Sequence, residues 1–195
     1  MSSDAVIGSS VLLEQVLKKY AEDFAQRNPA AKVLLRGLSL VGVGIRPLLD
    51  HFVFRTLDPK ERAREFLDLG YEKDPAAKLF SGRGHHTEVY RNGCAPAILI
   101  KCPHDKPGQD GVKAFGDKDP YVLAVRVEDI DDAAFRLEKQ AVAFLRPSAG
   151  KKDDSLRQIA AVPEMRGGVP AGYVMFVERH AGDRRFYLPG FWESV

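Results

Sequence analysis

Alternating polar and apolar positions predict a β-strand at residues 49–55, which read LDHFVFR. Successive side chains of a strand point to opposite faces of a sheet, so His51, Val53 and Arg55 share one face. The two phenylalanines of the segment lie on the other face. The strand therefore has one aromatic face and one face that carries a histidine and an arginine.

An amphipathic helix is predicted directly after this strand, over residues 58–70. Asp58 is a suitable N-cap, Pro59 fits the first turn and Gly70 is a suitable C-cap. The apolar stripe of the helix includes Phe66 and must be buried, and the nearest apolar surface is the phenylalanine face of the strand. The histidine and the arginine are then left on the far face, where they can form the floor of a site.

The same pattern occurs a second time, in residues 121–140. When Val122 is superimposed on His51, Arg126 falls on Arg55, because each arginine follows four residues later. Two strand-helix units offset by 71 residues indicate a tandem structural repeat. The repeat places two arginines on the inner face but a histidine on only one of the two strands.

The remaining pattern completes an α+β fold with two β-α-β-β-β modules. We expect a helical extension in residues 1–47, a first module in 48–102, a linker in 103–119 and a second module with a tail in 120–195. The linker assignment rests on the three prolines and three glycines of residues 103–120. Helices are expected at residues 10–27 and 30–36. Strands are expected at residues 78–80, 85–90, 97–101, 143–146, 155–161 and 173–179, with a loop at 163–170 and an aromatic tail at 186–192 that covers the mouth of a cavity.

Composition adds few constraints. The 195 residues are 45% hydrophobic and 29% charged, as in an ordinary soluble globular protein, and the net charge is only +2. A charge this weak does not favour nucleic acid or a membrane surface as a partner. We find no apolar run that would span a bilayer and no signal-peptide pattern, so a cytoplasmic location is expected. The spacing of Cys94 and Cys102 matches no zinc motif, and a homodimer is compatible with the sequence.

Four stretches carry a resemblance to a known family. Paired β-α-β-β-β modules are the architecture of the vicinal oxygen chelate superfamily of glyoxalases and dioxygenases. Within it, the chain resembles the 2-oxoadipate dioxygenase/decarboxylase (hydroxyglutarate synthase) family. The stretches are YAEDFAQRNPAAKVLL at residues 20–35, DHFVFRTL at 50–57, AKLFSGRGHH at 77–86, and SLRQIA at 155–160 ahead of YVMFVERH at 173–180.

The resemblance implies an iron(II) site of two histidines and one carboxylate, an arrangement that leaves positions open for a 2-oxo acid and dioxygen. The first histidine falls on His51, and an arginine that holds the substrate carboxylate falls on Arg55. The second histidine falls on Val122 and the carboxylate on Met175. Valine cannot bind a metal and a thioether is a poor ligand for iron(II), so the implied triad is incomplete. Gln158 matches a glutamine of the family's pocket.

A rebuilt metal site is the alternative. His86 and Glu88 share a strand face and could join His51, and Glu178 could replace Met175 if a bulge changed the face of its strand. The plain alternative for His51 is a core histidine whose hydrogen bonds are satisfied. For the inner arginines it is a surface position or pairing with internal carboxylates such as Glu88.

Two functions follow. The first is a glyoxalase/dioxygenase-fold protein with a degenerate metal site that needs no cofactor and binds a small anionic, 2-oxo acid-like ligand through Arg55, Arg126 and Gln158. The second is an iron(II)-dependent dioxygenase or decarboxylase of a 2-oxo acid with relocated ligands.

Overall fold

The computed structural model describes residues 3–41, 49–77, 84–188 and 191. Its helices are α1 (Ser3–Arg27), α2 (Pro29–Val41), α3 (Pro59–Asp68), α4 (Lys106–Phe115) and α5 (Ile130–Glu138). Its strands are β1 (Leu49–Arg55), β2 (Glu72–Lys73), β3 (His85–Arg91), β4 (Ala97–Pro103), β5 (Val122–Val127), β6 (Phe144–Ala149), β7 (Leu156–Ala161), β8 (Glu164–Arg166) and β9 (Val169–Arg179).

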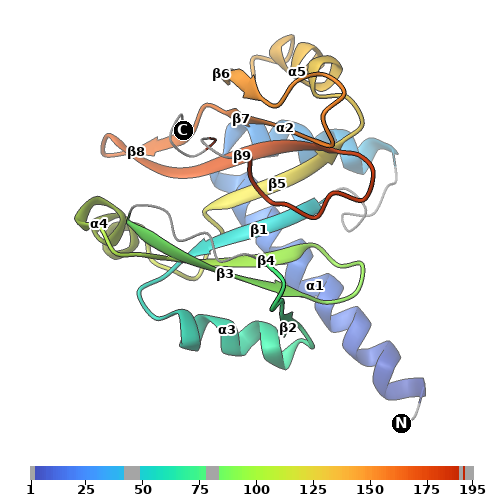
Figure 1. Ribbon diagram of the computed structural model, residues 1–195, viewed down its shortest axis with the longest axis vertical. Coiled ribbons are helices and arrows are strands. Elements are labelled where there is room, and N and C mark those ends of the chain that lie inside the picture. Colours follow the sequence, from blue (N-terminus) through green and yellow to red (C-terminus); the bar gives the residue numbers. More distant parts are fainter. Residues whose placement is uncertain (1–2, 42–48, 78–83, 189–190, 192–195) are drawn as a thin grey trace.

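Two β-α-β-β-β modules share one curved sheet (Figure 1). The first module is β1, α3, β2, β3 and β4, and the second is β5, α5, β6, β7 and β9. Across the sheet the order is β2-β3-β4-β1-β5-β9-β7-β6. In each module the first and last strands pair in parallel, and the modules meet through the antiparallel pair of β1 with β5. The α+β fold of tandem modules is thus confirmed.

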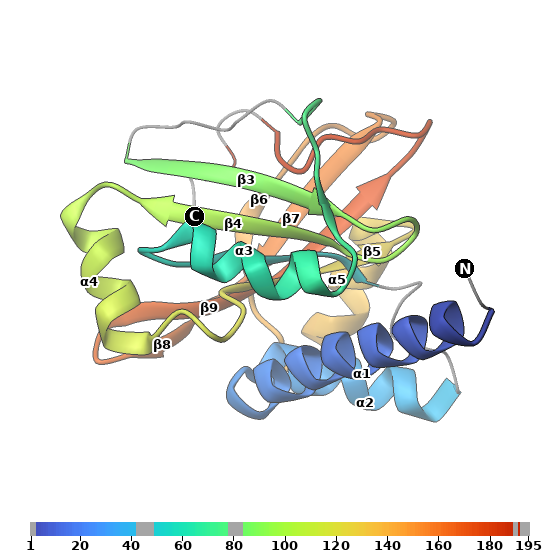
Figure 2. The same cartoon turned by 90° about the horizontal axis from the view of Figure 1, so that it is seen from below.

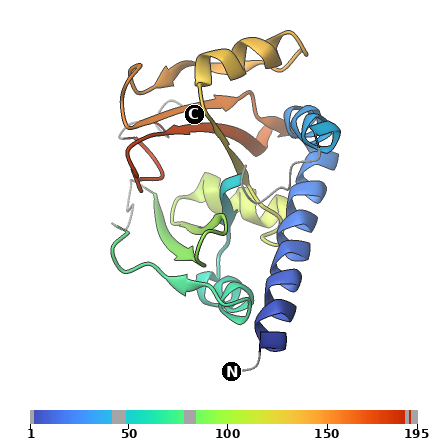
Figure 3. The same ribbon diagram turned by 90° about the vertical axis from the view of Figure 1, so that its right-hand side faces the viewer.

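Helices cover the outer face of the sheet, where α1, α2, α3 and α5 lie around the curve (Figure 3). Phe52 and Phe54 of β1 are fully buried there beneath Phe66 of α3. The ring centroids of Phe54 and Phe66 are 5.1 Å apart. Phe24 of α1 joins the same cluster, and Figure 2 shows α1 and α2 packed side by side. The predicted facing of the first strand is therefore correct.

The inner face is also apolar, and part of it is covered by the chain itself. Val53 of β1 and Leu99 of β4 form one cluster with Val122, Ala124 and Met175 of the second module. Three aromatic side chains from beyond β9 complete this cluster: Phe186, Tyr187 and Phe191. We call residues 186–188 and 191 the aromatic segment. Sequence placed this segment over the mouth of a cavity, but its rings are buried against the sheet.

The expected linker at residues 103–119 contains the helix α4, which the sequence pattern did not predict. Asp105 caps α4 by accepting a hydrogen bond from the Gly108 backbone N–H at 3.0 Å. Pro107 lies in the first turn, where a missing N–H costs nothing. The prolines and glycines that suggested a linker are therefore compatible with a short helix, whose Gly111 lies against the guanidinium of Arg55.

Several boundaries also differ from the predictions. The expected loop at 163–170 contains β8, which forms a tight hairpin with β9 through Gly167 and Gly168, both at positive φ. Helix α1 begins at Ser3 and α2 extends to Val41, so both are longer than expected. The predicted strand at 78–80 lies outside the described residues, and the short β2 takes the first place after α3. None of the described helices is both long and apolar enough to cross a bilayer.

Candidate functional site

His51 lies on the inner face of β1 and is fully buried. Its cross-strand neighbour is Ala124, and the pairing of β1 with β5 is irregular between Leu49 and His51. This irregularity brings the preceding residue, Asp50, to the same imidazole. Asp50 Oδ2 lies 2.8 Å from His51 Nδ1. Strict alternation would have sent Asp50 to the outer face, which is why the sequence pattern did not identify it.

Asp50 is the centre of a buried charge network. Arg179 donates to both of its carboxylate oxygens, from Nε at 3.1 Å and from Nη2 at 2.9 Å, and Arg126 donates from Nη2 at 3.0 Å. Burial disfavours the charged carboxylate, but the hydrogen bond with His51 and the guanidinium of Arg179 lower the pKa of Asp50 well below its usual range. The predicted inner-face residue Arg126 is thus paired with a carboxylate, and this carboxylate is Asp50 and not Glu88.

The aromatic segment contacts the other side of the His51 ring. Tyr187 Oη is 3.3 Å from His51 Nε2, and the ring of Phe186 meets the imidazole edge-on at 5.2 Å. Since Asp50 accepts from Nδ1–H, Nε2 is left to accept from the phenol. Burial lowers the pKa of His51 and raises that of Tyr187 well above its ordinary value, so both groups are neutral at pH 7.

Gln158 fixes the aromatic segment in place. Its Nε2 donates to the Phe186 carbonyl at 2.5 Å, and its Oε1 accepts from the Leu188 N–H at 2.8 Å. Both ends of this buried amide are therefore bonded to the chain's own backbone. The expected contact of Gln158 with a ligand stays a prediction.

The implied iron positions converge, but their side chains do not fit iron(II). His51, Ala124 and Met175 lie next to one another across three adjacent strands, and Val122 pairs with Val53 one step along. Val122 and Met175 are buried within the inner apolar cluster. A valine, a thioether and one imidazole whose Nε2 faces a phenol make a poor donor set for a hard cation.

The relocated ligands do not come together either. On β3, Val89 belongs to the inner cluster and Tyr90 to the outer one, so His86 and Glu88 share the outer face with Tyr90. They contact each other at 3.5 Å, on the opposite side of the sheet from His51. Within the described part of the chain, no three His, Cys, Asp or Glu side chains are grouped so that they could hold a metal ion.

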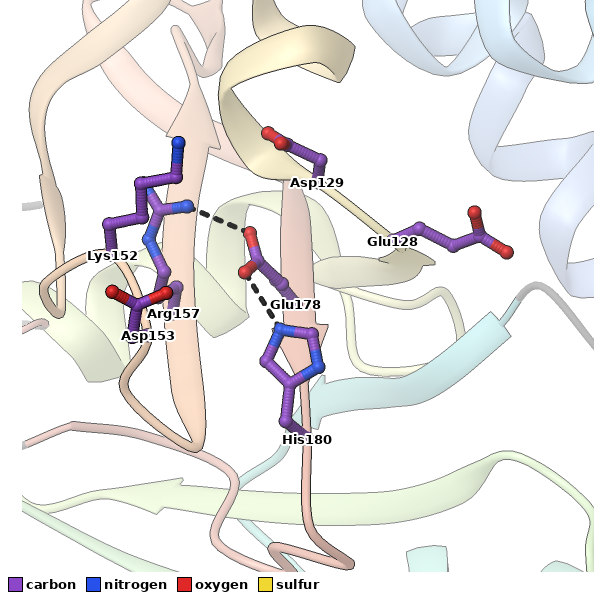
Figure 4. A pocket seen from close by; sticks show the side chains of 7 residues that line it. All are labelled: Glu128, Asp129, Lys152, Asp153, Arg157, Glu178 and His180. Atoms are coloured by element: carbon purple, nitrogen blue, oxygen red, sulfur yellow. Dashed lines mark hydrogen bonds and ion pairs between the residues drawn. The ribbon is translucent and has the colours of Figure 1, made fainter.

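Glu178 also faces away from His51, because its strand pairs with β5 in unbroken register and Met175 and Glu178 keep opposite orientations. Its carboxylate accepts from the Ile130 N–H and from Arg157, at 2.8 and 2.9 Å, and contacts His180 Nε2 at 2.9 Å. This network lines an open cleft of about 410 Å³ beside α5 (Figure 4). The cleft residues are Glu128, Asp129, Lys152, Asp153, Arg157, Glu178 and His180.

Arg55 lies at the other end of the inner face, near α4. Its guanidinium carbon is 3.3 Å from the centroid of the Tyr121 ring. On another side it faces Gly111 of α4, where a methyl group in place of the glycine hydrogen would lie 3.4 Å from Arg55 Nη1. Lys101 of β4 is its register partner. Among the described residues Arg55 forms no ion pair with a carboxylate. Burial lowers the pKa of Arg55, but a guanidinium remains charged.

Lys101 and Tyr121 were not identified from the sequence. Burial, and secondly the charge of Arg55, lower the pKa of Lys101 to about 8. Burial raises the pKa of Tyr121, whose ring meets Tyr173 edge-on at 5.3 Å. The signal for Lys101 was available, since it lies two residues beyond the inner-facing Leu99. This alternation places Lys101 beside Arg55 only when β4 is known to pair with β1, which the sequence did not show.

Two modules joined through their first strands, each closed by a parallel first and last strand, define the vicinal oxygen chelate fold, and the protein has this fold. Similar solved structures support the assignment. Hydroxyglutarate synthase from Oryza sativa in complex with 2-oxoadipate is 17% identical and has a TM-score of 0.66 over 95% of this chain and 84% of its own.

Two other solved structures are similar over less of the chain. Methylmalonyl-CoA epimerase from Mycobacterium tuberculosis is 23% identical with a TM-score of 0.52, covering 70% of this chain and 91% of its own. A variant of 4-hydroxymandelate synthase from Streptomyces coelicolor is 19% identical with a TM-score of 0.55, covering 72% and 51%. No family model matches the sequence, and no curated protein matches it. At these identities the likeness establishes the fold.

Proposed function

We propose that this protein binds a small carboxylate-bearing molecule at the Arg55 end of its inner face, without a metal ion at His51. One observation carries the proposal. Arg55 is a half-buried guanidinium that has an aromatic ring and no carboxylate as its partner in the described residues. Burying a charge is costly unless an opposite charge accompanies it, so an anionic ligand would supply the missing partner.

The chemistry of the Arg55 end favours a carboxylate. A planar guanidinium donates two parallel hydrogen bonds to a carboxylate, and the Tyr121 ring stacked on it limits its orientation. Lys101 adds a second positive charge on the same face. The rice hydroxyglutarate synthase structure contains 2-oxoadipate, which supports a 2-oxo acid as the ligand class.

Three further observations support a metal-free role. Val122 and Met175 stand where the resemblance implies two ligands, and both are packed in an apolar cluster. Tyr187 faces the His51 nitrogen that would bind the metal. The iron-dependent alternative requires His86, Glu88 or Glu178 beside His51, and all three lie on the opposite face. A binding protein is therefore favoured over an oxygenase.

Isothermal titration calorimetry tests the anion site. Wild-type protein is titrated with 2-oxoadipate, adipate and inorganic phosphate, and the variants Arg55→Gln and Arg136→Gln are compared with it. Arg136 is an exposed arginine on α5 and is the matched control. Loss of a charge-assisted bidentate contact should weaken carboxylate binding by about 10–100-fold in Arg55→Gln. Equal affinity of wild type and Arg55→Gln, or no binding by wild type, would refute the proposal.

An oxygen electrode tests the metal-free part separately. With added iron(II) and 2-oxoadipate, we expect no oxygen uptake above the level of the His51→Ala variant. Uptake by wild type that disappears in His51→Ala would restore the dioxygenase alternative. The calorimetric result would stand in either case.

A further inference from the structure

Lys101 lies beside the proposed carboxylate site on the same face of the sheet. Arg55 and Lys101 are register partners in the parallel pair of β1 and β4. Register partners project to the same side, and neighbouring strands are about 4.8 Å apart. Leu99, two residues before Lys101, belongs to the inner apolar cluster. The Lys101 and Arg55 side chains therefore project from adjacent strands to the same inner face.

We infer that Lys101 is a nucleophile that forms a Schiff base with the carbonyl group of a 2-oxo acid whose carboxylate is bound by Arg55. The inference rests on the proposed function and names its ligand class. In a 2-oxo acid the carbonyl carbon is bonded directly to the carboxylate carbon. A carboxylate on Arg55 therefore brings an electrophilic carbon to the side chain on the adjacent strand.

The surroundings of Lys101 raise the share of its neutral, nucleophilic form, while most of the amines keep the positive charge that attracts an anion. The side chain is half-buried, and Thr87, its register partner on β3, is buried on its other side. Burial and the charge of Arg55 lower the Lys101 pKa to about 8, while Asp105 acts in the opposite direction. At neutral pH a far larger share of the Lys101 amines is therefore neutral than for an ordinary lysine, whose pKa is about 10.4. Desolvation and a neighbouring cation are the two means by which proteins activate lysine nucleophiles.

The reaction balances without an oxidant or a metal. The lone pair of neutral Nζ attacks the carbonyl carbon, a C–N bond forms and the carbonyl π electrons move to oxygen. The C–O bond of this carbinolamine then breaks, and the oxygen leaves as water with the two protons released by the amine. The product is an imine, which takes one proton from solvent to become the iminium ion.

Reductive trapping tests this inference. Wild-type protein is incubated with 2-oxoadipate and sodium cyanoborohydride, which converts an imine to a stable secondary amine, and the adduct is located by peptide mass spectrometry. We expect one adduct per chain, on Lys101, and none at this position in Lys101→Met. Lys113→Met, at an exposed lysine of α4, should trap as wild type does. Arg55→Gln should trap at least tenfold less.

The outcomes separate this inference from the proposed function. If calorimetry shows that wild type binds 2-oxoadipate but no more adduct forms than in Lys101→Met, the Schiff base is refuted and the anion site stands. If wild type neither binds nor traps, both are refuted. Circular dichroism checks that the variants are folded. Lys101→Arg, which keeps the charge without a nucleophilic amine, replaces Lys101→Met if the latter does not fold.

Discussion

Truncating Phe66 should remove a large part of the outer core. This side chain is fully buried between α3 and the sheet. Its ring centroid lies 5.1 Å from that of Phe54, 5.9 Å from Tyr71 and 6.2 Å from Tyr20. Phe→Ala in a core costs about 3–5 kcal/mol, and the cost is greatest where the walls cannot collapse. Rigid rings lie on three sides of Phe66, so the cost should fall in the middle or upper part of this range. We expect Phe66→Ala to lower the free energy of unfolding by about 4 kcal/mol.

Urea unfolding followed by circular dichroism measures this loss. With a slope of about 2–3 kcal/mol per molar urea, the midpoint should fall by roughly 1.3–2 M while the slope stays constant. Phe135→Ala is the matched control, because Phe135 on α5 is 56% exposed. It should change the free energy of unfolding by less than about 0.5 kcal/mol. A loss below about 1 kcal/mol in Phe66→Ala would show that α3 does not pack on the sheet as described.

Three further predictions concern the inner face. The triple change Val122→His, Met175→Glu and Tyr187→Ala should give the protein stoichiometric iron(II), measured by elemental analysis and lost on adding His51→Ala, since it supplies three ligands and frees Nε2. Asp50→Asn should lower the free energy of unfolding by about 3 kcal/mol, because it leaves two guanidinium groups without their carboxylate. The lowered pKa of Asp50 means that its contribution is complete above about pH 4 and is lost as the pH falls further, so acid should destabilise wild type more than Asp50→Asn. The raised pKa of Tyr187 means that its contribution is lost as the pH rises above about 10, and Tyr187→Phe should flatten that decline in alkaline urea titrations.

The repeat could be predicted because each module starts with a strong local signal. The strand at β1 alternates clearly, and Asp58 caps α3 through the Glu61 N–H as the sequence suggested. Helix α4 could not be predicted, because Pro107, Gly108 and Gly111 count as breakers when their positions in the helix are unknown. The hairpin of β8 and β9 had a usable signal in its two glycines, which supply the positive φ that a tight turn needs.

The site was harder to predict than the fold, because its decisive contacts join distant parts of the chain. Arg55 and His51 were placed on the correct face by alternation alone. The partner of His51 depends on a local irregularity in β1, and that of Gln158 depends on where the aromatic segment docks. The assembly of His86 and Glu88 with His51 failed because alternation within β3 does not say which of its faces matches the inner face of β1.

The aromatic segment belongs to neither repeat, yet both repeats pack against it. Val53, Val89 and Leu99 of the first module and Val122 and Met175 of the second share a cluster with its rings. A fragment containing the first module alone would therefore lack the aromatic side chains that cover its inner face. That apolar face would be exposed to water, which favours aggregation over independent folding. A change of side-chain volume on the inner face of either module has to be accommodated by the rings of the aromatic segment. We therefore expect the two halves to vary together in sequence, through a segment that lies outside both of them.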